Sequence, residues 1–226
     1  MSPLSTASKF MISRLQKRDA IRRQSEESME EMISAHNKIL SAAISLLDRA
    51  SEKKFDVADT TLSEQMHLVA QFILGLDLTM QSILTGCYHQ AANLLKQETE
   101  ILAVIEEYTK ELRQQVKKPN VGNHLKPFYP KYSELNDIAH PSRADVVQLF
   151  TQFEEGDAHG PTTIPKFNLE LSRNFFGYHT LLLTKVAWKM DEAFRSALCI
   201  QFNEDEVAMI LDGLSTLKTE GQIKMP

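Results

Sequence analysis

The sequence predicts an all-α fold, an up-and-down bundle of about five long helices with shorter helices between them. Glycine and proline are scarce, with 8 of each in 226 residues, so the chain has few of the residues that make tight turns. Apolar residues recur at steps of three and four, the spacing of one helical face, and no stretch shows the alternation of a half-buried strand. With 42% hydrophobic residues, the chain can bury a sizeable core.

Three long helices are expected in the first half of the chain. The first carries a stripe of apolar residues from Met29 to Leu47, and a break over residues 55–60 follows it. Thr61 with Glu64 has the pattern of a capping box and predicts the start of the second helix. The third is expected over residues 88–117. The inward residues predicted for the three are Met29, Ile33, His36, Leu40, Ala43 and Leu47; Leu62, Met66, Val69, Ile73, Leu76, Met80 and Ile83; and Leu94, Ile101, Ile105, Tyr108, Leu112 and Val116.

Two loops rich in proline and glycine divide the second half, over residues 119–130 and 156–165. Between them we expect a short helix over 131–140 and another that Ser142 opens. A long helix follows the second loop, and a capping pattern at Asn203 opens the last helix. The inward residues predicted for the long helix are Leu171, Phe175, His179, Leu182, Val186, Met190, Phe194 and Ala197.

The charge distribution separates a basic leader, residues 1–24, from a single helical-bundle domain, residues 25–226. From Lys9 to Arg23 the chain carries a net charge of +5, whereas the whole chain carries −5, so the remainder carries −10 and repels a phosphate backbone. The leader fits a nucleic-acid arm, a membrane-surface helix or a transit peptide. We favour a fourth interpretation, a solvent-exposed helix that pairs with the acidic stretch that follows it.

Several kinds of site are excluded by what the sequence lacks. It has no glycine-rich phosphate loop. Glu64 and His67 have the spacing of a di-iron motif, but no other histidine has a glutamate three residues before it. The two cysteines are isolated, so we expect no metal, no cofactor and no disulfide framework, and we expect Cys87 to be a buried thiol. The absence of a disulfide framework predicts a reducing compartment and hence a cytoplasmic protein. No apolar run approaches the ~20 residues of a membrane span, so we expect a soluble chain without a membrane partner.

One short segment carries a chemical signature. Asn136, Asp137 and His140 are crowded at the end of a predicted helix, and Pro141 disfavours helical geometry at His140, which places the imidazole at the helix edge. An imidazole beside an amide and a carboxylate can transfer protons near neutral pH. The same residues also fit a structural role, in which the amide and the imidazole order the loop and the carboxylate neutralises a nearby cation. From the residues alone, both interpretations stay open.

The segment resembles the signature of the HEPN-like superfamily, whose all-α bundles carry an Arg followed by a His, often written Arg-Asn-x-x-x-His. Asn136, His140 and their spacing match, but Leu135 occupies the arginine position. The chain is most similar to a bacterial branch in which Tyr-x-x-Leu and His-Pro-Ser replace the arginine-bearing form, and here Tyr132 and Ser142 complete that pattern.

A second part of the resemblance lies further upstream. That branch carries an aromatic-rich turn followed by a Leu-Leu-Arg…Glu helix, and residues 86–90 and 94–100 are similar to it. Lys96 stands for the usual arginine, Glu100 matches the glutamate, and the polar Glu98 and Thr99 stand where apolar residues are expected. The whole resemblance covers about a third of the chain, residues 76–153.

The resemblance implies a homodimer. In nuclease members, two protomers place their Arg–His motifs in one cleft and cleave RNA without a metal, because a cation stabilises the charge on phosphorus while His moves the proton. Leu135 cannot supply that cation, although Lys96, Lys131 or Arg143 are candidates to replace it. Non-catalytic members are binding or oligomerisation modules, and many members belong to toxin–antitoxin or phage-defence systems.

Two hypotheses follow. The first is a non-catalytic, dimeric interaction module in a bacterial stress-response or defence system, with a protein partner. The alternative is a divergent, metal-independent ribonuclease that uses His140 with Asn136 or Asp137 on RNA. The candidate binding residues in either case are Tyr132, Ser142, Arg143, Lys96 and Glu100.

Overall fold

The computed structural model describes residues 3–53, 60–113, 117–140, 144–155 and 158–223. Helices make up nearly all of the regular structure, which confirms the predicted all-α bundle. The elements are α1 (Pro3–Ser28), α2 (Glu30–Ser51), α3 (Thr60–Leu84), α4 (Tyr88–Thr109), α5 (Val121–His124), the 3-10 helix η1 (Lys126–Phe128), α6 (Tyr129–Ala139), α7 (Ala144–Thr151), the strands β1 (Gln152–Glu155) and β2 (Ala158–Pro161), α8 (Leu169–Leu198) and α9 (Glu204–Thr219).

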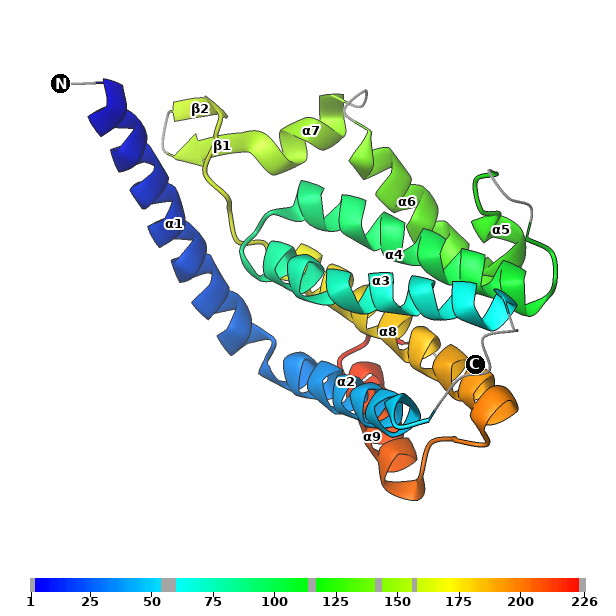
Figure 1. Ribbon diagram of the computed structural model, residues 1–226. Coiled ribbons are helices and arrows are strands. Elements are labelled where there is room, and N and C mark those ends of the chain that lie inside the picture. Colours follow the sequence, from blue (N-terminus) through cyan, green and yellow to red (C-terminus); the bar gives the residue numbers. More distant parts are fainter. Residues whose placement is uncertain (1–2, 54–59, 114–116, 141–143, 156–157, 224–226) are drawn as a thin grey trace.

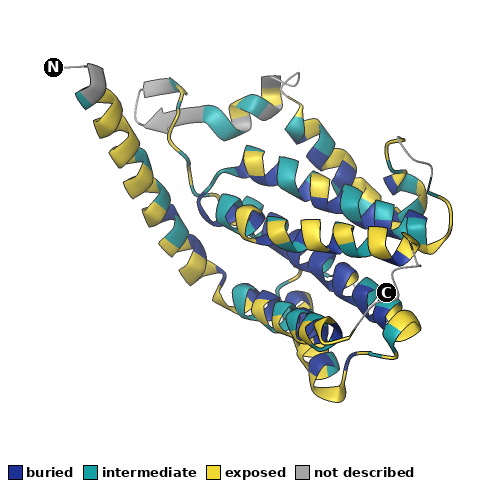
Figure 2. Ribbon diagram, viewed as in Figure 1, coloured by how far each residue is buried: buried dark blue, intermediate teal, exposed yellow. Residues whose placement is uncertain are grey.

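The longest helix, α8, lies at the centre of the bundle. It packs against α3 and α4 on one side and against α2 on the other, while α6 lies along α4 and α9 along α2 (Figure 1). Figure 2 shows that the buried residues concentrate where these helices face one another. Most of the residues that were predicted to point inward from α8 are buried, including His179. Two differ from the prediction, since Ala197 is exposed and Leu171 is only partly buried. Because helices pack against α8 from both sides, α8 positions the layer of α3, α4 and α6 relative to the layer of α2 and α9.

Local sequence signals set several helix ends. The side chain of Asn168 accepts a hydrogen bond from the Leu171 amide at 3.0 Å and caps α8. Asn203 and Glu206 form the predicted capping box of α9. Between α3 and α4 the chain turns at Gly86, whose φ is +73°, and a Cβ there would lie 2.5 Å from the carbonyl oxygen of Lys166. Only glycine therefore fits this turn.

The third helix is shorter than its hydrophobic pattern predicts. The pattern predicts a helix to residue 117, but α4 ends at Thr109, and Glu111 follows with a left-handed φ of 56°. The carboxylate of Glu107 holds the chain beyond this end, since it accepts hydrogen bonds from the Asn120 amide at 2.9 Å and from Arg113 at 2.8 Å. Leu112, predicted to point inward, is consequently exposed.

The buried face of α4 also differs from its prediction. Leu94 and Ile101 are only partly buried, whereas their neighbours Leu95 and Leu102 are completely buried. The helix contacts α3, α6 and α8, so it has a broad buried surface in place of one narrow stripe.

Other boundaries also need correction. Thr61 lies inside the first turn of α3, which includes Thr60, so it is not the predicted cap. The loop over 119–130 contains two short helical turns, α5 and η1. Residues 152–155 pair with 158–161 as an antiparallel hairpin that the apolar pattern did not predict. Such a short hairpin has too few residues to show a reliable alternation of apolar and polar side chains.

The helix α3 meets the length and composition of a membrane-crossing helix, contrary to the expectation that no segment does. Core helices meet the same test, and α3 buries Val69, Phe72, Leu76 and Ile83 against the bundle. Its apolar character extends to the outer surface, where Leu74 exposes 80% of its surface.

The basic leader forms the first part of α1, which extends beyond the bundle (Figure 1). The helix runs without a break across the proposed boundary at residue 24. Its second half contacts the bundle, where Ile21 and Ser25 are buried and the Ser25 hydroxyl donates to the Leu84 carbonyl at 3.0 Å. Within the described residues, the contact between the leader and the acidic stretch that follows it is a long one, 4.0 Å between Nε of Arg22 and Oε1 of Glu26.

Candidate functional site

The segment with the chemical signature lies at the end of α6. The helix ends at Ala139, and His140 has the extended backbone (φ −95°, ψ 114°) that a following proline favours. The imidazole of His140 is exposed, and within the described part of the chain it makes no hydrogen bond or ion pair. Pro141, Ser142 and Arg143 lie outside the described residues.

The two neighbours of His140 in the signature have different surroundings. Asn136 is partly buried, and its Oδ1 atom has no hydrogen-bond partner among the described residues. Asp137 is exposed on the helix surface. The structure therefore shows no hydrogen-bonded Asn–His pair of the kind that would order the loop, and His140 is not buried as a structural histidine.

The position that holds arginine in the resembling family is part of the core. Leu135 is completely buried and uncharged, so this position supplies no positive charge near His140. Lys131, a candidate replacement, has its Nζ atom 2.6 Å from the carboxylate of Glu134 on the same helix. Lys96 is partly buried on α4, and in the described region its ammonium group makes no hydrogen bond to His140.

The structure brings together two of the predicted binding residues, Tyr132 and Glu100. The Tyr132 hydroxyl donates to Oε1 of Glu100 at 2.6 Å, which joins α6 to α4. Nζ of Lys118 lies 3.8 Å from the same carboxylate oxygen and 5.8 Å from the centre of the Tyr132 ring. Burial and the hydrogen bond to Glu100 raise the pKa of Tyr132, so its hydroxyl stays protonated and acts as a donor. These contacts hold two helices together.

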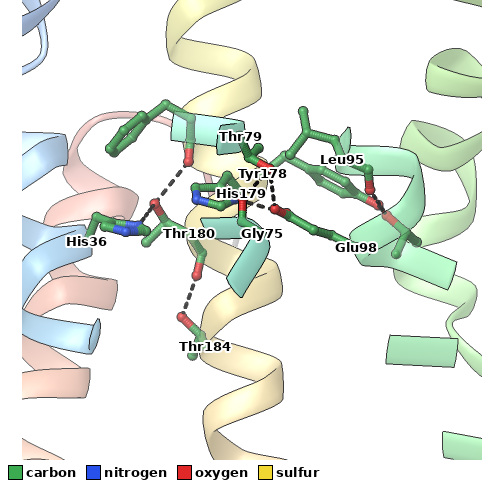
Figure 3. A network of polar contacts seen from close by, with 11 residues as sticks. His36, Gly75, Thr79, Leu95, Glu98, Tyr178, His179, Thr180 and Thr184 are labelled. Atoms are coloured by element: carbon green, nitrogen blue, oxygen red, sulfur yellow. Dashed lines mark hydrogen bonds and ion pairs between the residues drawn. The ribbon is translucent and has the colours of Figure 1, made fainter. Parts of the chain in front are cut away.

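A second polar cluster lies inside the bundle, between α2, α3, α4 and α8 (Figure 3). The carboxylate of Glu98 accepts a hydrogen bond from the Thr79 hydroxyl at 2.6 Å, and Nδ1 of His179 lies 2.9 Å from its other oxygen. Because a carboxylate only accepts hydrogen bonds, Nδ1 of His179 is the donor. Nε2 of His179 has no partner among the described residues.

The cluster continues to α2 through a second histidine. The rings of His36 and His179 stack with their centres 5.1 Å apart, and Nδ1 of His36 lies 3.2 Å from the Thr180 hydroxyl. Since that hydroxyl donates to the Phe176 carbonyl, it accepts from His36. Burial and the charge of the neighbouring His179 lower the pKa of His36 to about 3, so His36 is neutral at physiological pH.

This cluster has catalytic residue types but no access for a substrate. Glu98, His179 and His36 expose 3%, 0% and 1% of their surfaces. A buried polar cluster of this kind fixes the relative positions of helices. Two features of the sequence indicate this cluster, because both histidines lie on predicted inward stripes and Glu98 stands where an apolar residue is expected.

No family model, curated protein or solved structure matches this chain. The geometry of the chain itself is therefore the basis for a proposal about function.

Metal chemistry has no support in the described part of the chain, where no group of three or more His, Cys, Asp or Glu side chains could hold an ion.

Cys87 is half-buried, so the expectation of a buried thiol is wrong, and the Thr85 hydroxyl donates to its Sγ at 3.6 Å. Neither His140 nor Tyr132 lines the described surface pockets at Asn37, at Gln16 and at His89.

Sequence reasoning missed one surface. The first half of α1 exposes four large apolar side chains, whose exposed fractions lie between 43% and 55%. These are Phe10, Met11, Ile12 and Leu15. These apolar residues are visible in the sequence, but the basic residues among them led to the interpretation of the leader as a solvent-exposed helix.

Proposed function

We propose that this protein is a non-catalytic helical interaction module that acts as a homodimer. The observation that carries the proposal is the exposure of Phe10, Met11, Ile12 and Leu15 on the part of α1 that extends beyond the bundle. Large apolar side chains that gather on one exposed segment mark interaction surfaces in folded proteins.

The energetics of α1 support an interaction. An isolated helix of about 15 residues is marginally stable in water, and most helices gain stability by burying an apolar face. Only the second half of α1 does so within one chain, through residues such as Ile21. Burying a large apolar side chain completely contributes about 1.5–3 kcal/mol, so covering four half-exposed ones stabilises an assembly by several kcal/mol before the costs of association.

The geometry at the end of α6 supports a non-catalytic role. Phosphodiester cleavage by a histidine needs a cation for the developing charge, and the corresponding position holds the buried Leu135. The HEPN-like resemblance adds a setting to the proposal, a bacterial stress-response, toxin–antitoxin or phage-defence system in the cytoplasm. In this setting the module also binds a protein partner.

The oligomeric state tests this function. We expect the purified protein to sediment as a dimer, and the double variant Phe10→Asp/Leu15→Asp to sediment as a monomer with an unchanged circular dichroism spectrum. The matched control is Leu74→Asp on α3, because Leu74 is an exposed apolar residue outside α1. A wild-type protein that stays monomeric at every concentration contradicts the proposal.

A divergent ribonuclease is the second candidate, favoured by the exposed imidazole of His140 beside Asn136 and Asp137. The assay incubates structured and single-stranded RNA with the wild type and with His140→Ala, without metal. We expect no cleavage by either protein. Cleavage by the wild type that His140→Ala abolishes favours the ribonuclease over the non-catalytic module.

A further inference from the structure

A groove runs along the outer side of the α2–α9 pair, at the part of the bundle formed by the chain's last helix. It has a volume of about 870 Å³ and is lined from α2 by Ile33 and from α9 by Ala208 and Met209, with polar residues at its edges. Met209 exposes 41% of its surface. The groove therefore offers an apolar floor to a helix or an extended segment.

The edges of the groove are acidic. Glu30, Asp205 and Asp212 line it together with one cation, Lys38. Nζ of Lys38 lies 2.6 Å from Oδ2 of Asp212, so these two charges compensate each other. Within the described residues neither Glu30 nor Asp205 forms an ion pair, which leaves two carboxylates to attract a basic partner.

The first half of α1 has the complementary composition. It combines exposed apolar side chains with Lys9 and Arg14, contains no acidic residue, and is followed closely by Lys17. Phe10, Met11 and Ile12 are consecutive, so their side chains point in directions about 100° apart around the helix. A flat surface such as a membrane contacts only one side of a helix, whereas the floor and walls of a groove contact several.

The groove cannot be filled by α1 of the same chain. Only Met29 separates α1 from α2, and the second half of α1 is held on the bundle through Ile21 and Ser25. The exposed half of α1 therefore points away from the α2–α9 pair of its own chain (Figure 1). Pairing between two α1 helices brings together two segments of the same strong positive charge and is disfavoured.

We propose that the α2–α9 groove binds the first half of α1 from a second copy of this chain, an inference that rests on the homodimer proposed above. Each copy carries one such helix and one such groove, so a two-fold axis produces two equivalent contacts and closes the assembly. The apolar residues Phe10, Met11 and Leu15 cover the floor formed by Met209, and the basic residues face Glu30 and Asp205.

A cross-linking experiment tests the position of the contact. In a background with Cys87→Ser and Cys199→Ser, the variant Phe10→Cys/Met209→Cys is oxidised in solution at a concentration where the wild type is dimeric. We expect a covalent dimer. The matched control, Phe10→Cys/Leu74→Cys, carries its second cysteine at an exposed apolar position of α3 and forms no covalent dimer under the same conditions.

A charge experiment tests the same contact without new cysteines. We expect Asp205→Lys and Lys17→Glu each to weaken dimerisation at least tenfold by sedimentation equilibrium, and the double variant to recover a large part of the loss. Asp77→Lys on the outer face of α3 is the control and leaves the dissociation constant within twofold of the wild type.

The outcomes separate the inference from the function on which it rests. A dimer that cross-links through Leu74, or equally well through Phe10→Cys alone, overturns the groove contact but leaves the dimeric module intact. The groove contact is likewise overturned, and the dimeric module left intact, if Asp205→Lys weakens dimerisation no more than Asp77→Lys does. A monomer that binds anionic vesicles or nucleic acid through α1 overturns both.

Discussion

Nδ1 of His179 lies 2.9 Å from Oε2 of Glu98, and both side chains are buried in the middle of the bundle. The contact joins α8 to α4 across 81 residues of sequence, and Thr79 extends it to α3. Such a contact contributes to the register in which the three helices pack. Its energetic value is high mainly because loss of one partner leaves the other buried without compensation.

The first prediction concerns this pair. His179→Leu leaves the carboxylate of Glu98 with only one hydrogen bond in the core. We therefore expect the free energy of unfolding of this variant to be about 3–5 kcal/mol below that of the wild type in urea denaturation. The double variant Glu98→Leu/His179→Leu should lose less than the sum of the two single losses. Lys131→Ala removes the exposed contact with Glu134 and should cost at most about 1 kcal/mol. A loss below 1 kcal/mol in His179→Leu contradicts the assignment.

The second prediction concerns pH. The pKa of His36 is about 3 in the folded protein and near 6.5 in the unfolded chain. Between these values the unfolded state binds more protons, so the free energy of unfolding should fall as the pH decreases from 6.5 towards 3, by up to about 1.4 kcal/mol per pH unit. Above pH 6.5 this contribution is fully present.

The measurement compares variants, because carboxylates titrate in the same range. His36→Gln keeps an amide that can donate to Thr180 but does not titrate, so its unfolding free energy should depend less on pH than that of the wild type. Equal slopes in the wild type and in His36→Gln would show that His36 does not contribute.

The third prediction separates two tyrosines of α6. Tyr132→Phe removes the hydrogen bond to the half-exposed carboxylate of Glu100, and we expect it to cost about 1–2 kcal/mol of unfolding free energy. Tyr129→Phe changes a ring that is 49% exposed and should stay within about 0.5 kcal/mol of the wild type. Similar effects in the two variants argue against a structural role for the Tyr132–Glu100 contact.

The fourth prediction compares two glycines inside helices. A Cβ at Gly213 would lie 2.9 Å from the carbonyl oxygen of Ala35 and from side-chain atoms of Ile39, so Gly213→Ala should force α9 away from α2 at a cost of about 1–3 kcal/mol. A Cβ at Gly75 meets nothing within 4 Å, and Gly75→Ala should stabilise α3 by about 0.5–1 kcal/mol. Thermal unfolding of the two variants checks the opposite signs.

The Gly213 variant also bears on the proposed groove, which α2 and α9 form together. If the two helices separate, dimerisation should weaken in Gly213→Ala and remain unchanged in Gly75→Ala. Sedimentation of both variants provides this readout.

The sequence alone determined the helical class, the inward position of His36 and His179, and the cap at Asn203. Each of these depends on residues within one or two helical turns, where spacing and side-chain chemistry act directly. The end of α6 at Ala139 was predictable for the same reason, because a proline acts on the residue before it.

Only the tertiary structure decided which buried polar groups meet and which apolar side chains have no partner. Glu98 stood out as polar in the sequence, but its contact with His179 depends on the register of two helices, which the spacing within either one does not determine. The early end of α4 follows from contacts of Glu107 with residues beyond the helix, and the exposure of Phe10 follows from the direction in which α1 leaves the bundle. Hydrophobic periodicity identifies a face that needs a partner, whereas the packing of the whole chain determines whether that partner lies in the same molecule.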